Sequence, residues 1–375
     1  MTLSSNYSGF IRLIRFKMQR VVSKNLFNFP LKGEYDDDVL AMETQKQELS
    51  NSDEAIIIKT KIQEQMFLDD ENSDLQFAKH LRLAMGQNLR LASGHETLKK
   101  AMDEIVETEI WVPTAHDGKY DVQVHIYTPK YMTKNSNNPC YIYAHGGGAV
   151  ACTAKDFKPF LAYLAINCEI VIFNVDYRKA PETKCPNNVK DFYEAVKYVS
   201  NNATKLSVDK TKMSIGGDSG GGYICLATEV LLAQRNESNL VKLAIPGIPM
   251  VDDYLFSDTQ AMTKEEQNEA LMMRKIWKCI AMDLDAQKND PLLFPGKASD
   301  EILENFPPTI INEVEFDMFI TEATRLANRL RRAGKLLEFI IIPGAIHGAG
   351  LVQDLKCSKL FNESMKTVFR EYLHN

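Results

Sequence analysis

The chain has 375 residues, of which 45% are hydrophobic and 25% charged, and its formal net charge at pH 7 is −6. These values describe a globular protein long enough to bury a large core, and the acidic balance excludes the basic footprint of a nucleic-acid-binding protein. No run of about eighteen apolar residues is free of charge, so we expect no transmembrane helix.

The N-terminal third is predicted to be mainly helical. Residues 1–33 contain no acidic side chain but six lysines and arginines, interleaved with apolar residues. This pattern favours a cap helix, with an organelle-targeting peptide or a membrane-surface helix as alternatives, and its interrupted apolar runs exclude a secretory signal. Residues 34–74 are acidic and are predicted to connect short helices, and helical spacing of apolar residues follows over 81–105.

Strands are predicted from residue 107 onward. Residues 107–112 and 122–126 flank a turn and indicate an antiparallel hairpin at a sheet edge. Six short apolar runs come next, at residues 140–144, 170–175, 213–215, 243–245, 309–311 and 339–342. Helical segments separate them, notably at residues 189–199, after Ser219, and at 319–333 and 361–372. This alternation predicts an α/β fold with a mostly parallel sheet covered by helices on both faces.

One helical insertion interrupts the alternation, at about residues 252–288. It begins with a capping-box pattern at Thr263–Glu266 and continues with apolar residues at helical spacing. We expect this insertion to pack with the N-terminal helices as a cap over the carboxyl ends of the strands. The predicted organisation is therefore a helical region of residues 1–105 that contributes to the cap, and a catalytic domain of residues 106–375.

The seven cysteines are scattered without the paired spacing of a disulfide framework or a zinc site. Cys140 and Cys225 lie in apolar runs, which is typical of small buried hydrophobic residues. We therefore expect no metal, no cofactor and a reducing compartment, with the cytoplasm as the predicted location.

A glycine-rich turn with a serine at its apex follows the third apolar run, as Ile215-Gly216-Gly217-Asp218-Ser219-Gly220-Gly221-Gly222. A strand leads into the turn and a helical segment leaves it, so we expect Ser219 on a strained strand-to-helix turn at a helix N-terminus. Free N–H groups and the helix dipole favour negative charge there, as acyl transfer requires. The alternative is a structural glycine turn with an incidental serine.

A serine nucleophile needs a base, and the base needs an orienting acid. His347 follows the last predicted strand, in a loop at the strand's carboxyl end, where the active sites of α/β folds lie. Asp317 follows the preceding strand, with Glu313 and Glu315 as alternative acids and a helix N-cap as its alternative role. The chain order of Ser219, Asp317 and His347 is that of the α/β-hydrolases.

Consecutive glycines follow the first strand of the predicted parallel sheet, directly after His145. The N–H groups of Gly146 and Gly147, with that of Gly220, are predicted to form an oxyanion hole. We expect His145 to shape this loop by hydrogen bonding rather than to act in catalysis. A phosphate-binding nest is the alternative, but neither G-x-G-x-x-G nor G-K-[ST] occurs.

These motifs resemble the hormone-sensitive-lipase family of α/β-hydrolases over roughly residues 107–370. The matching segments are His145-Gly146-Gly147-Gly148, Asp176-Tyr177-Arg178-Lys179-Ala180-Pro181-Glu182, Gly217-Asp218-Ser219-Gly220-Gly221, Asn289-Asp290-Pro291-Leu292, Phe306-Pro307-Pro308-Thr309, Phe316-Asp317 and His347-Gly348. The segment at 176–182 makes the resemblance specific, because it carries no catalytic chemistry of its own.

The resemblance implies a carboxylic ester hydrolase with a helical cap. It assigns the nucleophile to Ser219, the orienting acid to Asp317 and the base to His347, with the oxyanion held by the three glycines named above. The chain departs from the family at four positions: Gly220 for the usual Ala, Ala149 for a common aromatic, Thr321 for a second Asp, and Tyr223 for Asn.

The segment Gly217–Gly221 also matches the nucleophile motif of chymotrypsin-like proteases. Those enzymes need the chain order His, Asp, Ser on an all-β double barrel. Here the serine comes first and a helix follows it, so we reject that interpretation.

We therefore predict a serine carboxylesterase that forms an acyl-enzyme on small to medium acyl esters. The alternatives are a non-catalytic small-molecule receptor on the same fold, which the retention of His347 disfavours, an amidase or deacetylase, and a membrane-associated lipid esterase. The expected partner is a small-molecule ester and not nucleic acid. Weak membrane association through the basic N-terminal stretch and a homodimer are further hypotheses.

Overall fold

The computed structural model describes residues 53–92, 94–116, 118–134, 136–257, 264–351 and 355–374. The predicted basic stretch of residues 1–33 and the predicted capping residue Thr263 lie outside these ranges.

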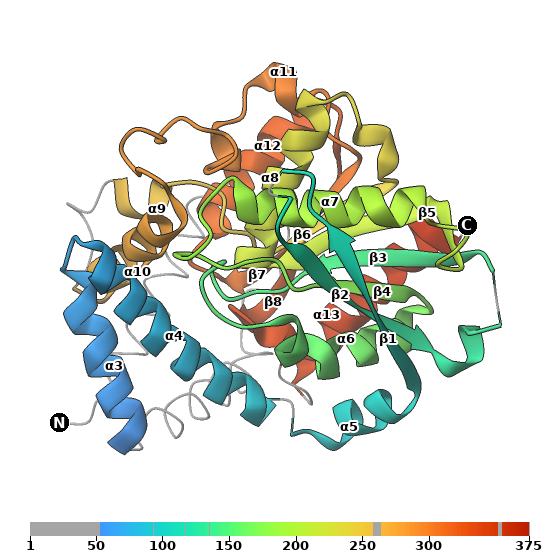
Figure 1. Cartoon of the computed structure of the whole chain (residues 1–375), viewed down its shortest axis with the longest axis horizontal. Coiled ribbons are helices and arrows are strands. Elements are labelled where there is room, and N and C mark those ends of the chain that lie inside the picture. Colours follow the sequence, from blue (N-terminus) through green and yellow to red (C-terminus); the bar gives the residue numbers. More distant parts are fainter. Residues whose placement is uncertain are drawn as a thin grey trace.

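An eight-stranded sheet forms the centre of the described structure, in the order β1-β2-β4-β3-β5-β6-β7-β8 (Figure 1). The strands are β1 (Ile105–Pro113), β2 (Asp121–Pro129), β3 (Asn138–Ala144), β4 (Val171–Val175), β5 (Val208–Asp218), β6 (Leu243–Gly247), β7 (Thr309–Phe316) and β8 (Leu336–Ile346). The hairpin β1–β2 is antiparallel and β2 joins β4 antiparallel, whereas all other neighbours pair in parallel. The predicted edge hairpin and mostly parallel sheet are confirmed.

Helices cover both faces of this sheet (Figure 1). They are α3 (Asp53–Met66), α4 (Glu71–Ala92), α5 (Glu96–Asp103), α6 (Ala154–Cys168), α7 (Asn187–Asn201), α8 (Gly220–Gln234), α9 (Tyr254–Ser257), α10 (Lys264–Ile280), α11 (Asp300–Leu303), α12 (Ile320–Arg332) and α13 (Lys356–Phe369). Of these, α7, α8 and α12 lie on one face, and α6 and α13 on the other. Among the described residues, no helix is both long and apolar enough to span a membrane.

Helix α8 is the most deeply buried helix of the fold's centre. Every residue from Gly220 to Ala233 is buried, and the helix packs on β5 and β6 on one side and on α7 and α11 on others. A helix that is buried all round has no solvent face and must be enclosed by other elements. The helix that leaves Ser219 is therefore fixed in the core.

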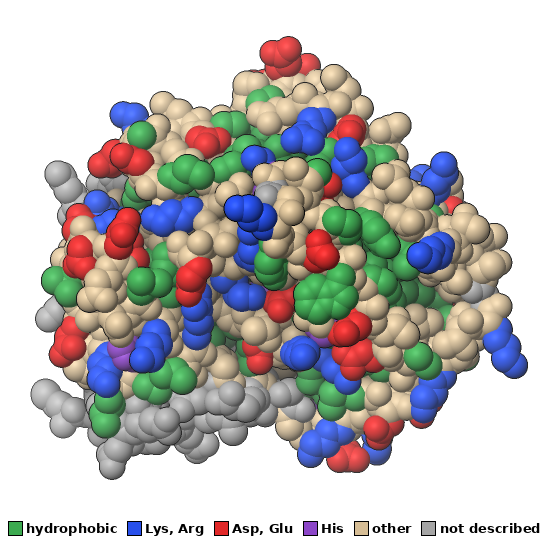
Figure 2. All heavy atoms as spheres, in the orientation of Figure 1, with side chains coloured by type: hydrophobic (Ala, Val, Ile, Leu, Met, Phe, Trp, Pro, Cys, Tyr) green, Lys and Arg blue, Asp and Glu red, His purple; other side chains and the backbone are tan. Residues whose placement is uncertain are grey.

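The surface carries charges of both signs. Figure 2 shows Lys and Arg side chains interspersed with Asp and Glu over the visible face, so no field of a single sign dominates it.

The N-terminal helices contact the mid-chain insertion through a buried ion pair. Lys275 of α10 is 3% exposed, and its Nζ lies 2.6 Å from Asp74 Oδ1 of α4. The same ammonium donates hydrogen bonds to Ser73 Oγ and to the carbonyl oxygen of Leu68, both at 2.8 Å. The ion pair and these two hydrogen bonds hold α4 against α10.

Replacing Lys275 by Met is expected to lower the free energy of unfolding by about 3 kcal/mol, because Asp74 stays buried without its counter-ion. Lys100→Met is the control, since its contact with Glu96 is exposed and 3.9 Å long. Urea unfolding followed by circular dichroism measures both variants. Equal effects in the two variants would contradict the assigned role of the buried pair.

Candidate active site

Four polar residues each come directly after the last residue of a parallel strand. His145 follows β3, Ser219 follows β5, Asp317 follows β7 and His347 follows β8. Because neighbouring parallel strands end at the same edge of a sheet, this edge gathers all four side chains.

Ser219 occupies a strained turn between β5 and α8. Its backbone angles are φ 59° and ψ −117°, a conformation that L-residues rarely adopt. Its N–H donates to the carbonyl oxygen of Gly247, and its own carbonyl accepts from Tyr223 N. A Cβ at Gly217 or at Gly221 would overlap the carbonyl oxygen of Ala144, so the turn packs against β3 with no room for side chains on either side of the serine.

The three predicted triad residues form one chain of hydrogen bonds. His347 Nε2 lies 2.9 Å from Ser219 Oγ, and His347 Nδ1 lies 2.7 Å from Asp317 Oδ2. Since the carboxylate only accepts, Nδ1 carries the proton and Nε2 is left to accept from the serine hydroxyl. Phe319 packs its ring edge-on against His347, with centroids 5.4 Å apart, and so supports the imidazole orientation.

Asp317 serves two partners at once. Its side chain is fully buried, and Oδ1 accepts from Phe319 N at 2.9 Å just before α12 begins, while Oδ2 faces His347. Orienting the histidine and capping the turn are thus compatible. The alternative acids turn elsewhere: Glu315 Oε2 accepts from Gly344 N, and Glu313 Oε2 accepts from Val314 N. Burial and the nearby Asp317 charge raise the pKa of Glu313 well above its ordinary value.

The predicted oxyanion glycines lie against the serine turn. A Cβ at Gly220 would overlap the backbone nitrogens of Gly148 and Ala149, and one at Gly146 would meet the carbonyl oxygen of Asp218 at 3.0 Å. Among the described residues, none of the N–H groups of Gly146, Gly147 and Gly220 has a hydrogen-bond acceptor. Unpaired donors grouped beside a nucleophile are what a developing oxyanion needs.

His145 fixes the direction of one of these donors. Its Nδ1 lies 2.8 Å from the carbonyl oxygen of Gly146, so Nδ1 must carry a proton, and burial lowers the pKa of the ring. In a trans peptide the C=O and N–H point in opposite directions, so holding Gly146 O also sets where Gly147 N–H points. Tyr177 stacks on the imidazole at 4.4 Å and donates to His145 O. His145 thus has the hydrogen bonds of a loop-shaping residue.

Asp218 and Tyr223 make contacts at the site that were not predicted from the sequence. Asp218, next to the nucleophile, is held by a 2.7 Å hydrogen bond from Tyr143 OH, and burial raises its pKa. Tyr223 donates to the carbonyl oxygen of Leu292 and packs edge-on against Trp277 of α10. Tyr223, which stands where the hormone-sensitive-lipase family has Asn, therefore connects α8 to the insertion.

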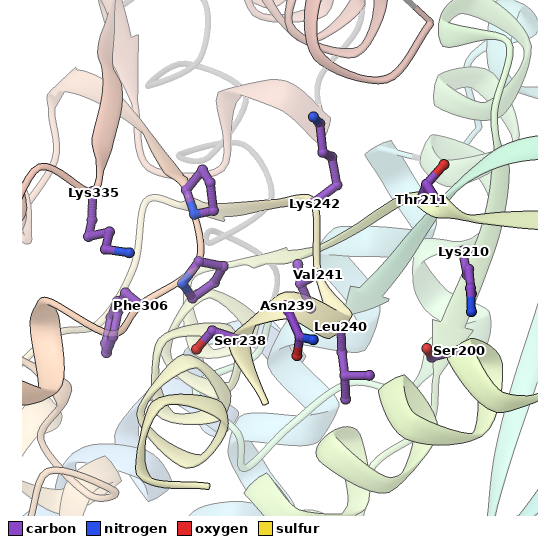
Figure 3. A pocket seen from close by; sticks show the side chains of 12 residues that line it. Ser200, Lys210, Thr211, Ser238, Asn239, Leu240, Val241, Lys242, Phe306 and Lys335 are labelled. Atoms are coloured by element: carbon purple, nitrogen blue, oxygen red, sulfur yellow. The ribbon is translucent and has the colours of Figure 1, made fainter. Parts of the chain in front are cut away.

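A hollow of about 680 Å³ lies elsewhere in the molecule (Figure 3). Its lining includes residues 238–242, residues 306–308 and Lys335, which precede β6, β7 and β8. It therefore opens at the amino ends of these strands, away from the candidate triad. Among the described residues, no group of three or more His, Cys, Asp or Glu side chains is arranged to hold a metal ion.

Three comparisons with known proteins agree on one family. A family model described as "alpha/beta hydrolase fold" matches residues 141–351. An arylesterase of Saccharolobus solfataricus is 30% identical over 258 residues, which cover 68% of this chain and 81% of that protein. The carboxylesterase NlhH of Mycobacterium tuberculosis is 27% identical over 246 residues, covering 62% of this chain and 72% of the relative. The solved structure of a bacterial heroin esterase superposes with a TM-score of 0.66 at 27% identity, covering 78% of this chain and 90% of that one.

The segment from Gly146 to Ala149, here called the glycine loop, lies close to the turn that carries Ser219. The variant Gly220→Ala tests this close approach. The added methyl group would overlap the backbone of Gly148 and Ala149, so the loop must move and its donors with it. We expect kcat for a short-chain ester to fall by about tenfold or more, since small displacements at a reacting centre are costly. Steady-state kinetics on the folded variant measure this. Unchanged kcat would contradict the assigned packing.

Proposed function

Because this chain belongs to the α/β-hydrolase fold family and its relatives include carboxylesterases, we propose that it is a serine carboxylesterase that works through an acyl-enzyme. The resemblance to esterases of this fold seen in the motifs is thereby confirmed.

One observation carries this mechanism. Ser219, His347 and Asp317 come from turns up to 128 residues apart in sequence, yet they form an unbroken chain of hydrogen bonds of 2.9 and 2.7 Å. This arrangement lets a base remove the serine proton while an acid stabilises the resulting imidazolium.

In the proposed reaction, His347 Nε2 takes the hydroxyl proton of Ser219 as Oγ bonds to the ester carbonyl carbon. The carbonyl oxygen becomes an anion, which the N–H groups of Gly146, Gly147 and Gly220 stabilise. His347 then gives its proton to the leaving alcohol as the ester C–O bond breaks. Water, deprotonated by the same histidine, then attacks the acyl carbon. The bond from that carbon to Ser219 Oγ breaks, His347 returns the proton to Oγ, and the carboxylic acid leaves.

We further propose that a helical cap lies over this site. In it, α3 and α4 come from the N-terminal region of residues 1–105, and α10 comes from the insertion at 252–288. The side chain of Ile276 on α10 would lie 3.2 Å from a Cβ at Gly148, so this helix borders the glycine loop. Such a border limits the room beside the oxyanion donors and favours small to medium acyl groups.

A series of p-nitrophenyl esters from acetate to palmitate tests the activity. We expect kcat/KM to be highest for short acyl chains, and Ser219→Ala to lower it by at least about 10⁴-fold. A wild-type protein that hydrolyses none of these esters, or a Ser219→Ala variant as active as wild type, would refute the proposal. Matched p-nitroanilides in the same assay test the alternative of an amidase.

A second test identifies the acid. Asp317→Asn should lower kcat by about 10³-fold or more, because an amide in place of the carboxylate does not stabilise the imidazolium. Glu315→Gln is the matched control, since its side-chain oxygen can still accept from Gly344 N, and its kcat should stay within about threefold of wild type. The opposite ranking would assign the orienting acid to Glu315.

A further inference from the structure

The glycine loop beside Ser219 is strained and has to be held in place. Gly147, Gly148 and Ala149 have φ values of 111°, 62° and 55°, and Cys152 follows at 65°. A left-handed backbone at a residue other than glycine costs about 1–3 kcal/mol and persists only where its surroundings enforce it. The hydrogen bonds of this loop therefore show what enforces its shape.

Most of the loop's carbonyl groups are bound from within the hydrolase region itself. Gly146 O faces the His145 ring, and Gly147 O accepts from the N–H groups of Val150 and Ala151. Ala149 O accepts from Ala180 N at 2.9 Å. These partners lie within the residues that match the family model.

Val150 O is bound from outside that region. It accepts at 2.9 Å from Nε of Arg82, which lies on α4 and precedes residue 141, where the match begins. The same guanidinium donates from Nη2 to the carbonyl oxygen of Ala180 at 3.0 Å. Since Ala180 N in turn binds Ala149 O, Arg82 bridges the two segments that meet at the loop.

A carboxylate fixes the plane of this guanidinium. Glu182 accepts from Nη1 at 2.8 Å and from Nη2 at 2.6 Å, and the bond to Arg82 holds the pKa of Glu182 below its ordinary value. All four contacts need the rigid fork of donors that only arginine has; a lysine ammonium could not reproduce them. Helix α4 is itself held to α10 by the buried pair of Asp74 and Lys275.

We propose that Arg82 is a positioning residue for the oxyanion loop, through which the N-terminal helical region takes part in catalysis as well as covering the site. Arg82 acts on the reaction only by holding the carbonyl groups of Val150 and Ala180, so that the neighbouring N–H donors keep their direction. This role rests on the esterase mechanism proposed above.

Removing the guanidinium donors of Arg82 should weaken stabilisation of the transition state more than it weakens substrate binding. For Arg82→Met we expect kcat for p-nitrophenyl butyrate to fall by about 10- to 100-fold with KM changed by less than about threefold. Arg82→Lys should lose most of the same activity although it keeps the charge opposite Glu182, and it serves as the second variant if Arg82→Met does not fold. Glu182→Gln, which leaves both carbonyl contacts in place, should lose less.

Arg329 offers a matched control. On α12 it also donates to two carbonyl groups, Gly296 O at 2.9 Å and Ala298 O at 2.6 Å, and it pairs with Asp300. Arg329→Met therefore removes a comparable clamp whose partners all lie outside the glycine loop. We expect a loss of thermal stability like that of Arg82→Met, with kcat within about threefold of wild type.

A trifluoromethyl ketone with a short alkyl group gives the decisive readout, because Ser219 Oγ adds to its carbonyl carbon and generates an oxyanion that needs the same donors. Its affinity should weaken in Arg82→Met by about the factor lost in kcat/KM. Unchanged inhibitor affinity and kcat in the folded Arg82 variants, or an equal loss of kcat in Arg329→Met, would overturn the proposal. A wild-type protein that neither binds the ketone nor hydrolyses esters would overturn the esterase mechanism, and this inference with it.

Discussion

The structure depends first on the backbone of Ser219, which is held at φ 59° between a strand and a helix. The neighbouring glycines permit this turn because Gly217 and Gly221 press against the carbonyl oxygen of Ala144, where a side chain would not fit. The complete burial of α8 and the bond from Ser219 N to Gly247 O then fix the turn in the core. This strained turn places the Ser219 hydroxyl at the N-terminus of α8. The helix N-terminus favours negative charge, such as the charge that develops in a transition state formed at that hydroxyl.

The parallel sheet brings the other residues of the site to the turn at Ser219. Strands β3, β5, β7 and β8 run in the same direction, so the residues that follow them meet at one edge although they are far apart in the chain. The glycine loop after β3 then needs support of its own, because it contains left-handed residues. That support comes from His145, from the segment around Ala180 and from Arg82 on α4, whose hydrogen bonds join the N-terminal helices to the glycine loop.

The sheet and the family could be predicted from the sequence because each is marked by a local pattern of residues. Continuous apolar runs predicted the parallel strands, and motifs after four of them predicted which residues the structure gathers around Ser219. The apolar pattern predicted β5 only at residues 213–215, whereas the strand spans Val208–Asp218. Residues 209–212 are polar and half-buried or exposed, and residues 216–218 belong to the glycine-rich segment that was assigned to the turn. The contact between Arg82 and Val150 leaves no such pattern, since it joins residues 68 positions apart through one side chain. Likewise, the need for Gly220 follows from the backbone of another segment, which no local motif shows.

Covalent labelling can show whether Ser219 is the residue that attacks the carbonyl carbon. A p-nitrophenyl alkylphosphonate should transfer its phosphonyl group to Ser219 Oγ with release of p-nitrophenolate, giving a stable analogue of the tetrahedral intermediate. Mass spectrometry of the intact chain and of its peptides should find one label per chain, on the peptide that contains Ser219, with ester hydrolysis lost in proportion to labelling. A label on another residue, or full hydrolysis by the fully labelled protein, would contradict nucleophilic attack by Ser219.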